Sequence, residues 1–384
     1  MKRAFLLSCL FGLFFVPASL AQTKKSLPDQ LDALFSSVTQ PDAPGLAVLI
    51  RRDGRTLFEK RYGVRDLRTK APIDSRTDFR LASFTKQFTA MAIMLLVHDG
   101  KLRYDQTLPS VFPEFPAYGK NITIRNLLNH TGGLPDYEDL MDAAEKSQGR
   151  ALWSPEHQIQ DAEVLALLEK ESRAKFPTST RWSYSNSGYV VLGLIVAKIS
   201  GQPYRDFLHA RIFSPIGMNR TLVYQKGKNE VPDRAFGYSK DGGALKDTDQ
   251  SSTSATLGDG GIYTNLEDLA KWDDALRRHT LLTAAEMQPA LTPAKLSDGS
   301  PTLWPQAQAS DDNLAPGQPV SYGFGWFLDP YRGHPRMWHT GGTSGFRTVI
   351  DRFTRDRLTI IILANRTDLE PSKLALAAAN LALP

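Results

Sequence analysis

The sequence has very little cysteine: Cys9 is the only one among 384 residues. Cys9 lies inside an N-terminal apolar stretch that we expect to be removed. The mature chain would then form no disulfide, no thiolate metal site and no cysteine nucleophile. Removal of this stretch would also remove two positive charges and lower the formal net charge from +5 to +3, which is too small to indicate nucleic-acid binding. After the N-terminal stretch, no apolar run is long enough to cross a membrane.

Two common catalytic signatures are also absent. The sequence contains no HExxH zinc helix and no GxSxG nucleophile elbow. Five histidines show no spacing typical of metal ligands: His98, His157, His209, His279 and His334. We therefore expect neither a metal ion nor a cofactor.

The N-terminus has the three parts of a signal peptide. Lys2 and Arg3 form a charged start, residues 6–16 form an apolar core, and Ser19-Leu20-Ala21 is a small-residue cleavage site. We expect residues 1–21 to be removed, with the mature chain starting near Gln22. The protein would be periplasmic or secreted, without a stable membrane anchor. An uncleaved anchor is the alternative, but the apolar core is short for a membrane span.

Strand patterns occur at both ends of the chain, and helix patterns occur in the middle. Residues 83–220 carry mainly helical spacing, including a helix pattern at 204–212. Residues 225–257 and 288–321 are polar or rich in glycine and proline, so we expect loops there. The strand patterns are residues 45–50 and 56–62, joined by an Asp53-Gly54 hairpin signal, and later 324–328, 336–339, 348–353 and 358–364.

This arrangement predicts an α/β fold. An antiparallel β-sheet would be built from both termini and flanked by helices, with an inserted all-helical domain beside it. The catalytic domain would span residues 22–384, with its α/β part at about 22–80 and 259–384. The helical part would span about 81–258. A cleft between two such parts is a natural place for an active site.

Ser83 and Lys86 stand at the start of a long apolar stretch. A serine hydroxyl attacks poorly at neutral pH unless a nearby base accepts its proton. If a helix begins at Ser83, Lys86 lies one turn further along the same face. Burial would lower the pKa of the lysine and let its amine act as that base. We therefore predict that Ser83 is the nucleophile of a secreted serine hydrolase.

The same Ser-x-x-Lys spacing occurs a second time, from Ser172 to Lys175. Sequence context separates the two matches. Lys86 is followed by a nearly continuous apolar run, which is typical of a buried helix, so Ser83 would be held rigidly. The Ser172 match ends a charged helix and runs into Phe176-Pro177, which is typical of a solvated surface.

Tyr184, Ser185 and Asn186 precede another apolar helix pattern. A tyrosine beside a lysine can have a lowered pKa and transfer protons. An asparagine amide can bind both a substrate amide and a lysine amine. The simpler interpretation is a helix N-cap formed by Asn186 or Ser187. These residues alone leave both interpretations open.

His339, Thr340, Gly341 and Gly342 follow a short strand pattern. Glycines there would let a substrate backbone approach the strand edge and pair with it. A backbone N–H near Gly342, with that of Ser83, could form an oxyanion hole. A simple turn between strands is the alternative. A Ser/His/Asp triad using Ser83 and His339 is also possible, but it fits less well than Ser/Lys/Tyr.

The three segments Ser83-Phe84-Thr85-Lys86, Tyr184-Ser185-Asn186 and His339-Thr340-Gly341 resemble a known signature in their order and rough spacing. It is the three-motif signature of the serine β-lactamase and penicillin-binding protein family, class C branch. Residues 127–135, 260–264 and 322–326 also look similar to segments of that family. The resemblance covers about residues 28–384 and implies an α/β sandwich with a helical domain.

The resemblance also implies a role for each matched residue. Ser83 would be the acylated nucleophile, Lys86 its proton acceptor, and Tyr184 the general base and acid. The Ser83 and Gly342 amides would form the oxyanion hole. The substrate-binding residues would be Asn186, His339, Thr340, Gly341 and Gly342. His130, which lies in one of the family-like segments, would be structural.

The third motif departs from the family pattern. His339 stands where β-lactamases and D,D-peptidases mostly carry a lysine, whose charge helps to bind a substrate carboxylate. Histidine is mostly neutral near pH 7, and we expect His339 to become partly charged as the pH falls toward 6. We therefore expect neutral esters or amides to be better substrates than penicillins or peptides ending in D-alanine.

The sequence thus predicts an exported serine hydrolase that acts through an acyl-enzyme on esters, amides or small peptides. We expect a small-molecule or peptide substrate and no nucleic acid as partner. A β-lactamase or D,D-carboxypeptidase is the enzymatic alternative. A non-catalytic relative that binds peptidoglycan or a protein partner is the alternative from another class.

Overall fold

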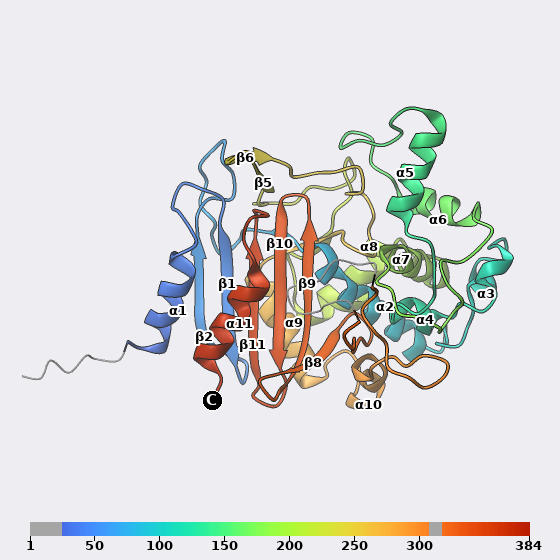
Figure 1. The fold of residues 1–384 in the computed structure, drawn as a ribbon. Helices are drawn as coiled ribbons and strands as arrows, with labels where there is room; N and C mark the ends of the chain where they lie inside the picture. The colour runs from blue at the N-terminus through green and yellow to red at the C-terminus, as the bar shows by residue number, and fades with distance from the viewer. Residues whose placement is uncertain (1–24, 307–316) are drawn as a thin grey trace, which may run out of the picture.

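The computed structural model describes residues 25–306 and 317–384. Its centre is a six-stranded antiparallel sheet in the order β2-β1-β11-β10-β9-β8 (Figure 1). The N-terminal part supplies β1 (Leu46–Arg52) and β2 (Arg55–Tyr62). The C-terminal part supplies β8 (Phe327–Tyr331), β9 (His334–Thr343), β10 (Phe346–Phe353) and β11 (Leu358–Ala364). β1 pairs with β11 along its whole length, so the prediction of a sheet built from both termini is confirmed.

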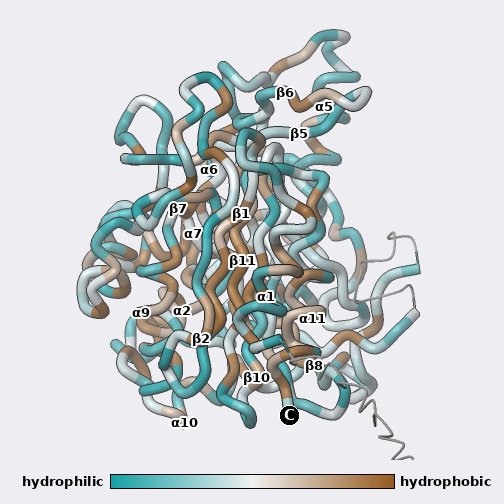
Figure 2. The backbone as a smooth tube through the Cα atoms, turned by 90° about the vertical axis from the view of Figure 1, so that its left-hand side faces the viewer, coloured by the Kyte–Doolittle hydropathy of each residue, from teal (hydrophilic) through white to brown (hydrophobic). Residues whose placement is uncertain are grey.

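Both faces of this sheet are covered. On β1, Val48 and Ile50 point to one hydrophobic cluster, while Ala47 and Leu49 point to the other. Helices α1 (Leu27–Ser36) and α11 (Pro371–Ala382) pack on the first face. The second face meets the 3-10 turn η1 (Ala82–Thr85), α2 (Lys86–His98) and α9 (Leu266–Arg278). Figure 2 shows the resulting hydrophobic centre along β1 and β11.

The middle of the chain is mainly helical, as predicted. Two small sheets accompany it, one in the order β3-β7-β4 and the other formed by β5 and β6. The remaining elements are β3 (Phe79–Arg80), α3 (Leu108–Val111), η2 (Ala117–Gly119), α4 (Ile124–Leu128), α5 (Tyr137–Gln148), α6 (Asp161–Glu169), α7 (Asn186–Ser200), α8 (Tyr204–Leu208), the π turn η3 (His209–Phe213), η4 (Ser214–Ile216), β4 (Leu222–Val223), β5 (Tyr238–Asp241), β6 (Ala244–Asp247), β7 (Ile262–Thr264), α10 (Ala284–Met287) and η5 (Gln288–Leu291). The α/β fold class is confirmed, and the division into two domains stays a prediction.

Two segments differ from the sequence-based expectation. Residues 225–257, which were predicted as loop, contain the β5–β6 hairpin. Its turn residues Gly242 and Gly243 have φ of +56° and +90°. Such values are accessible to glycine and match a two-residue hairpin turn. The strand predicted at residues 324–328 begins at Phe327, because Gly325, at φ +74°, belongs to a turn packed against the backbone of Lys86.

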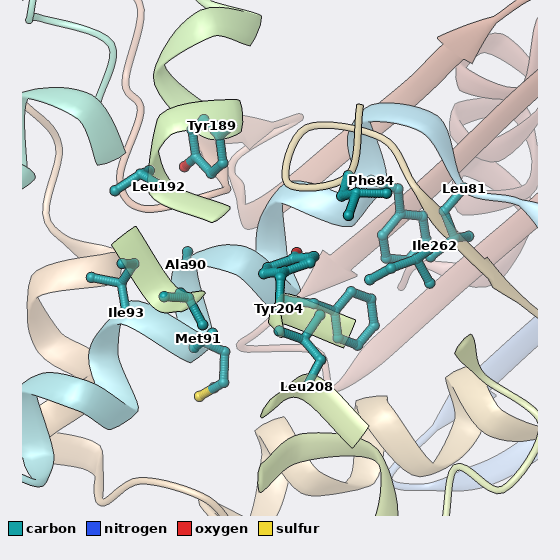
Figure 3. Close-up of a cluster of buried hydrophobic side chains, with 14 of the residues drawn as sticks. Leu81, Phe84, Ala90, Met91, Ile93, Tyr189, Leu192, Tyr204, Leu208 and Ile262 are labelled. Atoms are coloured by element: carbon teal, nitrogen blue, oxygen red, sulfur yellow. The ribbon is translucent and has the colours of Figure 1, made fainter. Parts of the chain in front are cut away.

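Helix α2 runs through the core, and its side chains are buried from Lys86 to Leu96. Figure 3 shows Ala90, Met91 and Ile93 of α2 among side chains from α7 and α8. Phe84 and Phe88 extend the same cluster, and replacing either by alanine would lower the unfolding free energy by about 3–5 kcal/mol. The surrounding packing therefore holds the start of α2, and the turn before it, in place.

The predicted signal peptide, residues 1–21, lies outside the described residues, as does the predicted mature start near Gln22. Within residues 25–306 and 317–384, no helix has both the length and the apolar character needed to cross a bilayer.

Candidate active site

Ser83 lies in the 3-10 turn η1, directly before α2, rather than in the α-helix itself. Hydrogen bonds on both sides anchor Leu81, the residue directly before η1. Its N–H donates to the Ile262 carbonyl at 2.9 Å, and its carbonyl accepts from Thr348 Oγ1 at 2.8 Å. Ala82 has φ of +50°, a conformation that is unfavourable by roughly 1–3 kcal/mol for a residue with a Cβ. The surrounding structure therefore holds a strained turn next to the Ser83 hydroxyl.

Lys86 is fully buried, and its amine makes three hydrogen bonds. Nζ lies 3.0 Å from Ser83 Oγ, 2.8 Å from Asn186 Oδ1 and 3.1 Å from the Asp259 carbonyl. The structure thus brings together three elements that are far apart in sequence: the start of α2, the start of α7 and the segment before β7. The predicted Ser83–Lys86 contact is present.

The environment of Lys86 favours its neutral form. Burial lowers the pKa of Lys86 from 10.5 to about 8, and the charges of Asp259, Glu138 and Asp136 act in the opposite direction. With a pKa of about 8, roughly one lysine in ten is neutral at pH 7. A neutral amine 3.0 Å from the hydroxyl can accept the serine proton.

The Tyr184-Ser185-Asn186 segment serves both as a helix cap and as part of the site. Ser185 is the N-cap of α7, and its Oγ accepts the Gly188 N–H at 3.1 Å. Neither Asn186 nor Ser187 forms this cap, so the Asn186 amide can face Lys86 instead. The ring of Tyr184 lies beside the same amine, with 4.8 Å between Lys86 Nζ and the ring centroid.

His130 is a site neighbour that sequence reasoning classed as structural only. Its Nδ1 accepts the Ser185 N–H at 3.2 Å, and its ring centroid lies 4.5 Å from that of Tyr184. Burial holds the pKa of His130 well below 6.5. His130 therefore positions the Tyr184 segment as a neutral ring. The available signal was its place in the family-like residues 127–135.

His339 is buried and faces an aromatic cluster, with 1 % of its surface exposed. Nε2 lies 3.0 Å from the Tyr322 hydroxyl, and Nδ1 lies 2.6 Å from the Thr340 carbonyl. This pattern suits the neutral ring, with Nδ1–H donating to the carbonyl and Nε2 accepting from Tyr322. Burial and the charge of Lys86 lower the pKa of His339 to about 3. The expectation that His339 becomes partly charged near pH 6 is therefore wrong.

The third motif lies on a free strand edge. β8 pairs with β9 only as far as Trp338, so no strand among residues 25–306 and 317–384 pairs with residues 339–343 on that side. The β9–β10 loop has two residues, which makes Thr343–Phe346 a hydrogen-bonded pair and Gly342–Arg347 a non-bonded one. Because residues of a non-bonded pair turn their backbone polar groups away from the partner strand, the Gly342 N–H points to the free edge.

Gly341 lets this edge approach the η1 turn that carries Ser83. A Cβ added at Gly341 would lie 2.0 Å from the Leu81 carbonyl oxygen and 2.3 Å from Thr348 Oγ1. At Gly342 an added Cβ would meet only the Arg347 side chain, at 3.7 Å or more. Glycine is therefore required sterically at Gly341, where β9 crosses η1.

The other candidate positions lie elsewhere. Ser172, of the second Ser-x-x-Lys match, is exposed in a segment outside any helix. Within residues 25–306 and 317–384, no group of three or more His, Cys, Asp or Glu side chains is arranged to hold a metal ion.

Comparison with known proteins agrees with this geometry. The sequence model of the Beta-lactamase family matches residues 31–383. Penicillin-binding protein 4* of Bacillus subtilis is 31% identical over 359 residues, which are 90% of this chain and 73% of that protein. A D-aminopeptidase of Cereibacter sphaeroides is 26% identical over 329 residues, 84% of this chain and 57% of that protein.

Among solved structures, the D-amino acid amidase of Ochrobactrum anthropi SV3 has a similar fold. The TM-score is 0.72 at 23% identity, covering 93% of this chain and 99% of that one. The chain belongs to the Beta-lactamase family, and it is a serine hydrolase of that family.

Proposed function

We propose that this protein is an exported hydrolase that acts through an acyl-enzyme on amides, esters or small peptides. The observation that carries the proposal is the hydrogen bond between the buried Lys86 amine and the Ser83 hydroxyl, at 3.0 Å. The lowered pKa of Lys86 supports it, because a base must be neutral to accept a proton.

In this mechanism, Ser83 Oγ attacks the substrate carbonyl and its proton passes to the Lys86–Tyr184 pair. The N–H groups of Ser83 and Gly342 stabilise the oxyanion of the tetrahedral intermediate. As the C–N or C–O bond breaks, Tyr184 returns the proton to the leaving group. Water then attacks the Ser83 ester and releases the acid, which regenerates the free hydroxyl.

The relatives suggest D-amino-acid amides and D-aminoacyl peptides as the first substrates to test. A protein named as a D-aminopeptidase is 26% identical to this chain, and a D-amino acid amidase shares its fold. We also propose that residues 1–21 direct export and are removed. N-terminal sequencing of the exported protein would test this, with Gln22 as the expected first residue.

A β-lactamase or D,D-carboxypeptidase is the second candidate. The 31% identity to penicillin-binding protein 4* favours it. The neutral His339 supplies no charge for a substrate carboxylate, so this candidate requires another cation near the third motif.

The test combines covalent labelling with a substrate panel. A fluorescent fluorophosphonate should label the wild-type protein and Ser172→Ala, the matched control from the second Ser-x-x-Lys site. Ser83→Ala should not be labelled, and it should hydrolyse no substrate while keeping the wild-type Tm. The panel consists of p-nitrophenyl acetate, D- and L-alanine p-nitroanilide, and nitrocefin.

Each outcome separates the candidates. Faster turnover of the D-anilide than of nitrocefin would support an amidase or peptidase, and the reverse order would support a β-lactamase. Labelling that persists in Ser83→Ala would contradict the nucleophile assignment. A wild-type protein that neither reacts with the probe nor turns over any substrate would favour the non-catalytic binding protein.

A further inference from the structure

A cavity outside the catalytic site lies among α6, α7, α8 and the segment before β7. Its volume is about 330 Å³, which is within the range of roughly 300–1,000 Å³ that small-molecule pockets have. Ser83, Lys86 and Tyr184 are not among the residues that line it. The cavity is large enough for a small ligand, and such a ligand would not touch the catalytic side chains.

One wall of the cavity belongs to the segment that holds Lys86. Asp161, at the start of α6, lines the cavity, and its Oδ1 accepts the Leu257 N–H at 3.0 Å. Two residues after Leu257, the Asp259 carbonyl accepts a hydrogen bond from Lys86 Nζ at 3.1 Å. The cavity and the catalytic site therefore lie on either side of one short segment.

Asp161 brings a carboxyl group to this cavity without a cation beside it. Within residues 25–306 and 317–384, its Oδ2 accepts no hydrogen bond and the carboxyl group forms no ion pair. Burial raises the pKa of Asp161 to about 8, and the charge of Asp259 acts in the same direction. A carboxyl group that is withdrawn from water and lacks a counter-ion would be stabilised by a cation that a ligand supplies.

Two cationic residues line the same cavity, Arg205 and Lys228. Arg205 is paired through Nε with the neighbouring Asp206, and Lys228 is exposed and forms no ion pair in the described part of the chain. A purely anionic ligand would meet Asp161, and a purely cationic one would meet Arg205 and Lys228. The lining therefore favours a ligand that carries one charge of each sign.

We propose that this cavity is a second binding site, which takes a free α-amino acid in its zwitterionic form. The ammonium group lies against Asp161, and the carboxylate lies against Lys228 and Arg205. Leu194 and Ala197 of α7 provide an apolar wall for a small aliphatic side chain. The inference does not depend on the proposed function, although hydrolysis of an amino-acid amide would release this class of compound.

Binding should be linked to the loss of a proton. The charged or titratable groups that adjoin Asp161 are Asp259, Arg205, Lys228 and Tyr204. With a pKa of about 8, the free carboxyl group of Asp161 is mostly protonated at pH 7, whereas a bound ammonium group favours the carboxylate. We expect about 0.9 proton to be released per ligand at pH 7, and about a tenfold gain in affinity from pH 6 to pH 7.

The test measures binding by isothermal titration in the Ser83→Ala background, where no ligand is turned over. The probe is alanine, as each enantiomer, compared with N-acetylalanine and alaninamide of the same configuration. N-acetylalanine lacks the ammonium group, and alaninamide lacks the carboxylate. One alanine should bind per chain, and each analogue should bind about tenfold more weakly, because it loses one charge-assisted interaction. Titrations in buffers of different ionisation enthalpy should show the released proton.

Asp161→Asn keeps an acceptor for the Leu257 N–H but cannot ionise. It should lower the affinity for alanine about tenfold or more and abolish the proton release. Glu169→Gln is the matched control, because Glu169 ends the same helix and does not line the cavity. It should bind alanine like the Ser83→Ala parent. Thermal melts check the fold, and if Asp161→Asn does not fold, Lys228→Gln at the exposed rim should still weaken binding a few-fold.

Hydrogen–deuterium exchange locates the bound alanine. Exchange should slow at residues 160–162 and at Leu257, whose N–H bond to an ionised carboxylate is charge-assisted, and it should not change at residues 339–343. Absence of binding, equal binding of alanine and its analogues, or unchanged affinity in Asp161→Asn would overturn the proposal. Protection confined to residues 339–343 would do so as well, because the ligand would then occupy the catalytic site. Failure of the proposed function is distinct, since it would appear as labelling and turnover that do not depend on Ser83.

Discussion

The pH dependence of acylation tests the role of Lys86 most directly. Its folded-state pKa of about 8 lies below the ordinary value of 10.5, so protonated Lys86 predominates below pH 8. If the neutral amine is the base, kcat/KM should rise with pH and level off above about pH 8.5. The pKa of about 8 leaves about 10% of the lysine neutral at pH 7 and about 1% at pH 6. We therefore expect about a tenfold gain in kcat/KM from pH 6 to pH 7.

Replacing a neighbouring carboxylate should change the pKa of Lys86. Glu138 is one of three acidic groups whose charge raises the pKa of Lys86. Glu138→Gln should therefore move the acidic limb of the profile to lower pH. A screened charge interaction of at most about 1 kcal/mol corresponds to a shift of at most about 0.7 pH units. Asp139→Asn is the matched control, because Asp139 is the next residue of the same helix and is not among the charges that act on Lys86.

The assay is the initial rate of p-nitrophenyl ester hydrolysis from pH 5.5 to 9.5, corrected for spontaneous hydrolysis. A flat profile would refute the reasoning, as would a limb that moves equally in Glu138→Gln and Asp139→Asn. A limb near pH 7 would instead indicate Glu138, because burial raises its pKa to about 7. The two histidines beside the site do not provide such a limb, because the pKa values of His130 and His339 both lie well below 6.5.

Three further outcomes follow from the contacts of the site. Gly341→Ala should lower both Tm and activity, because the added Cβ would lie 2.0 Å from the Leu81 carbonyl oxygen. Gly342→Ala should have the wild-type Tm, because a Cβ there meets only the Arg347 side chain. Equal Tm values for the two variants would contradict the steric argument. Tyr184→Phe should keep the wild-type Tm and lower kcat/KM by about 10²–10⁴, and an unchanged rate would remove Tyr184 from the mechanism. In the unfolded chain His339 binds a proton below about pH 6.5, whereas in the folded chain it stays neutral down to about pH 3. The free energy of unfolding should therefore fall by roughly 2–4 kcal/mol as the pH drops from about 6.5 to about 3. Urea unfolding should show a shallower pH dependence in His339→Gln, and an identical slope would contradict the buried neutral ring.

Local sequence patterns predicted the elements that depend on continuous burial. The apolar run after Lys86 predicted a helix buried on every side, and α2 is buried from Lys86 to Leu96. The Asp53-Gly54 pair predicted a hairpin turn, and both residues have positive φ. Helix α5 was not singled out within the stretch predicted as mainly helical, although Tyr137, Leu140 and Met141 form an apolar stripe that packs on the core. Only Tyr137 and Met141 of its 12 residues are buried, so the stripe is narrow and the periodic pattern is weak.

The order of the three motifs predicted which residues meet, because a family signature carries tertiary information that the individual residues lack. What each residue does depends on neighbours that are distant in sequence. Ser185 caps α7 and leaves Asn186 for Lys86, although either Asn186 or Ser187 was the expected cap. The charge of His339 could not be inferred from its usual pKa, because Tyr322 and the aromatic cluster remove it from water. Sequence therefore determined which residues are candidates for the site, whereas tertiary structure decided their ionisation. The pKa of a group depends on its solvent exposure and on charges that the fold alone brings near it.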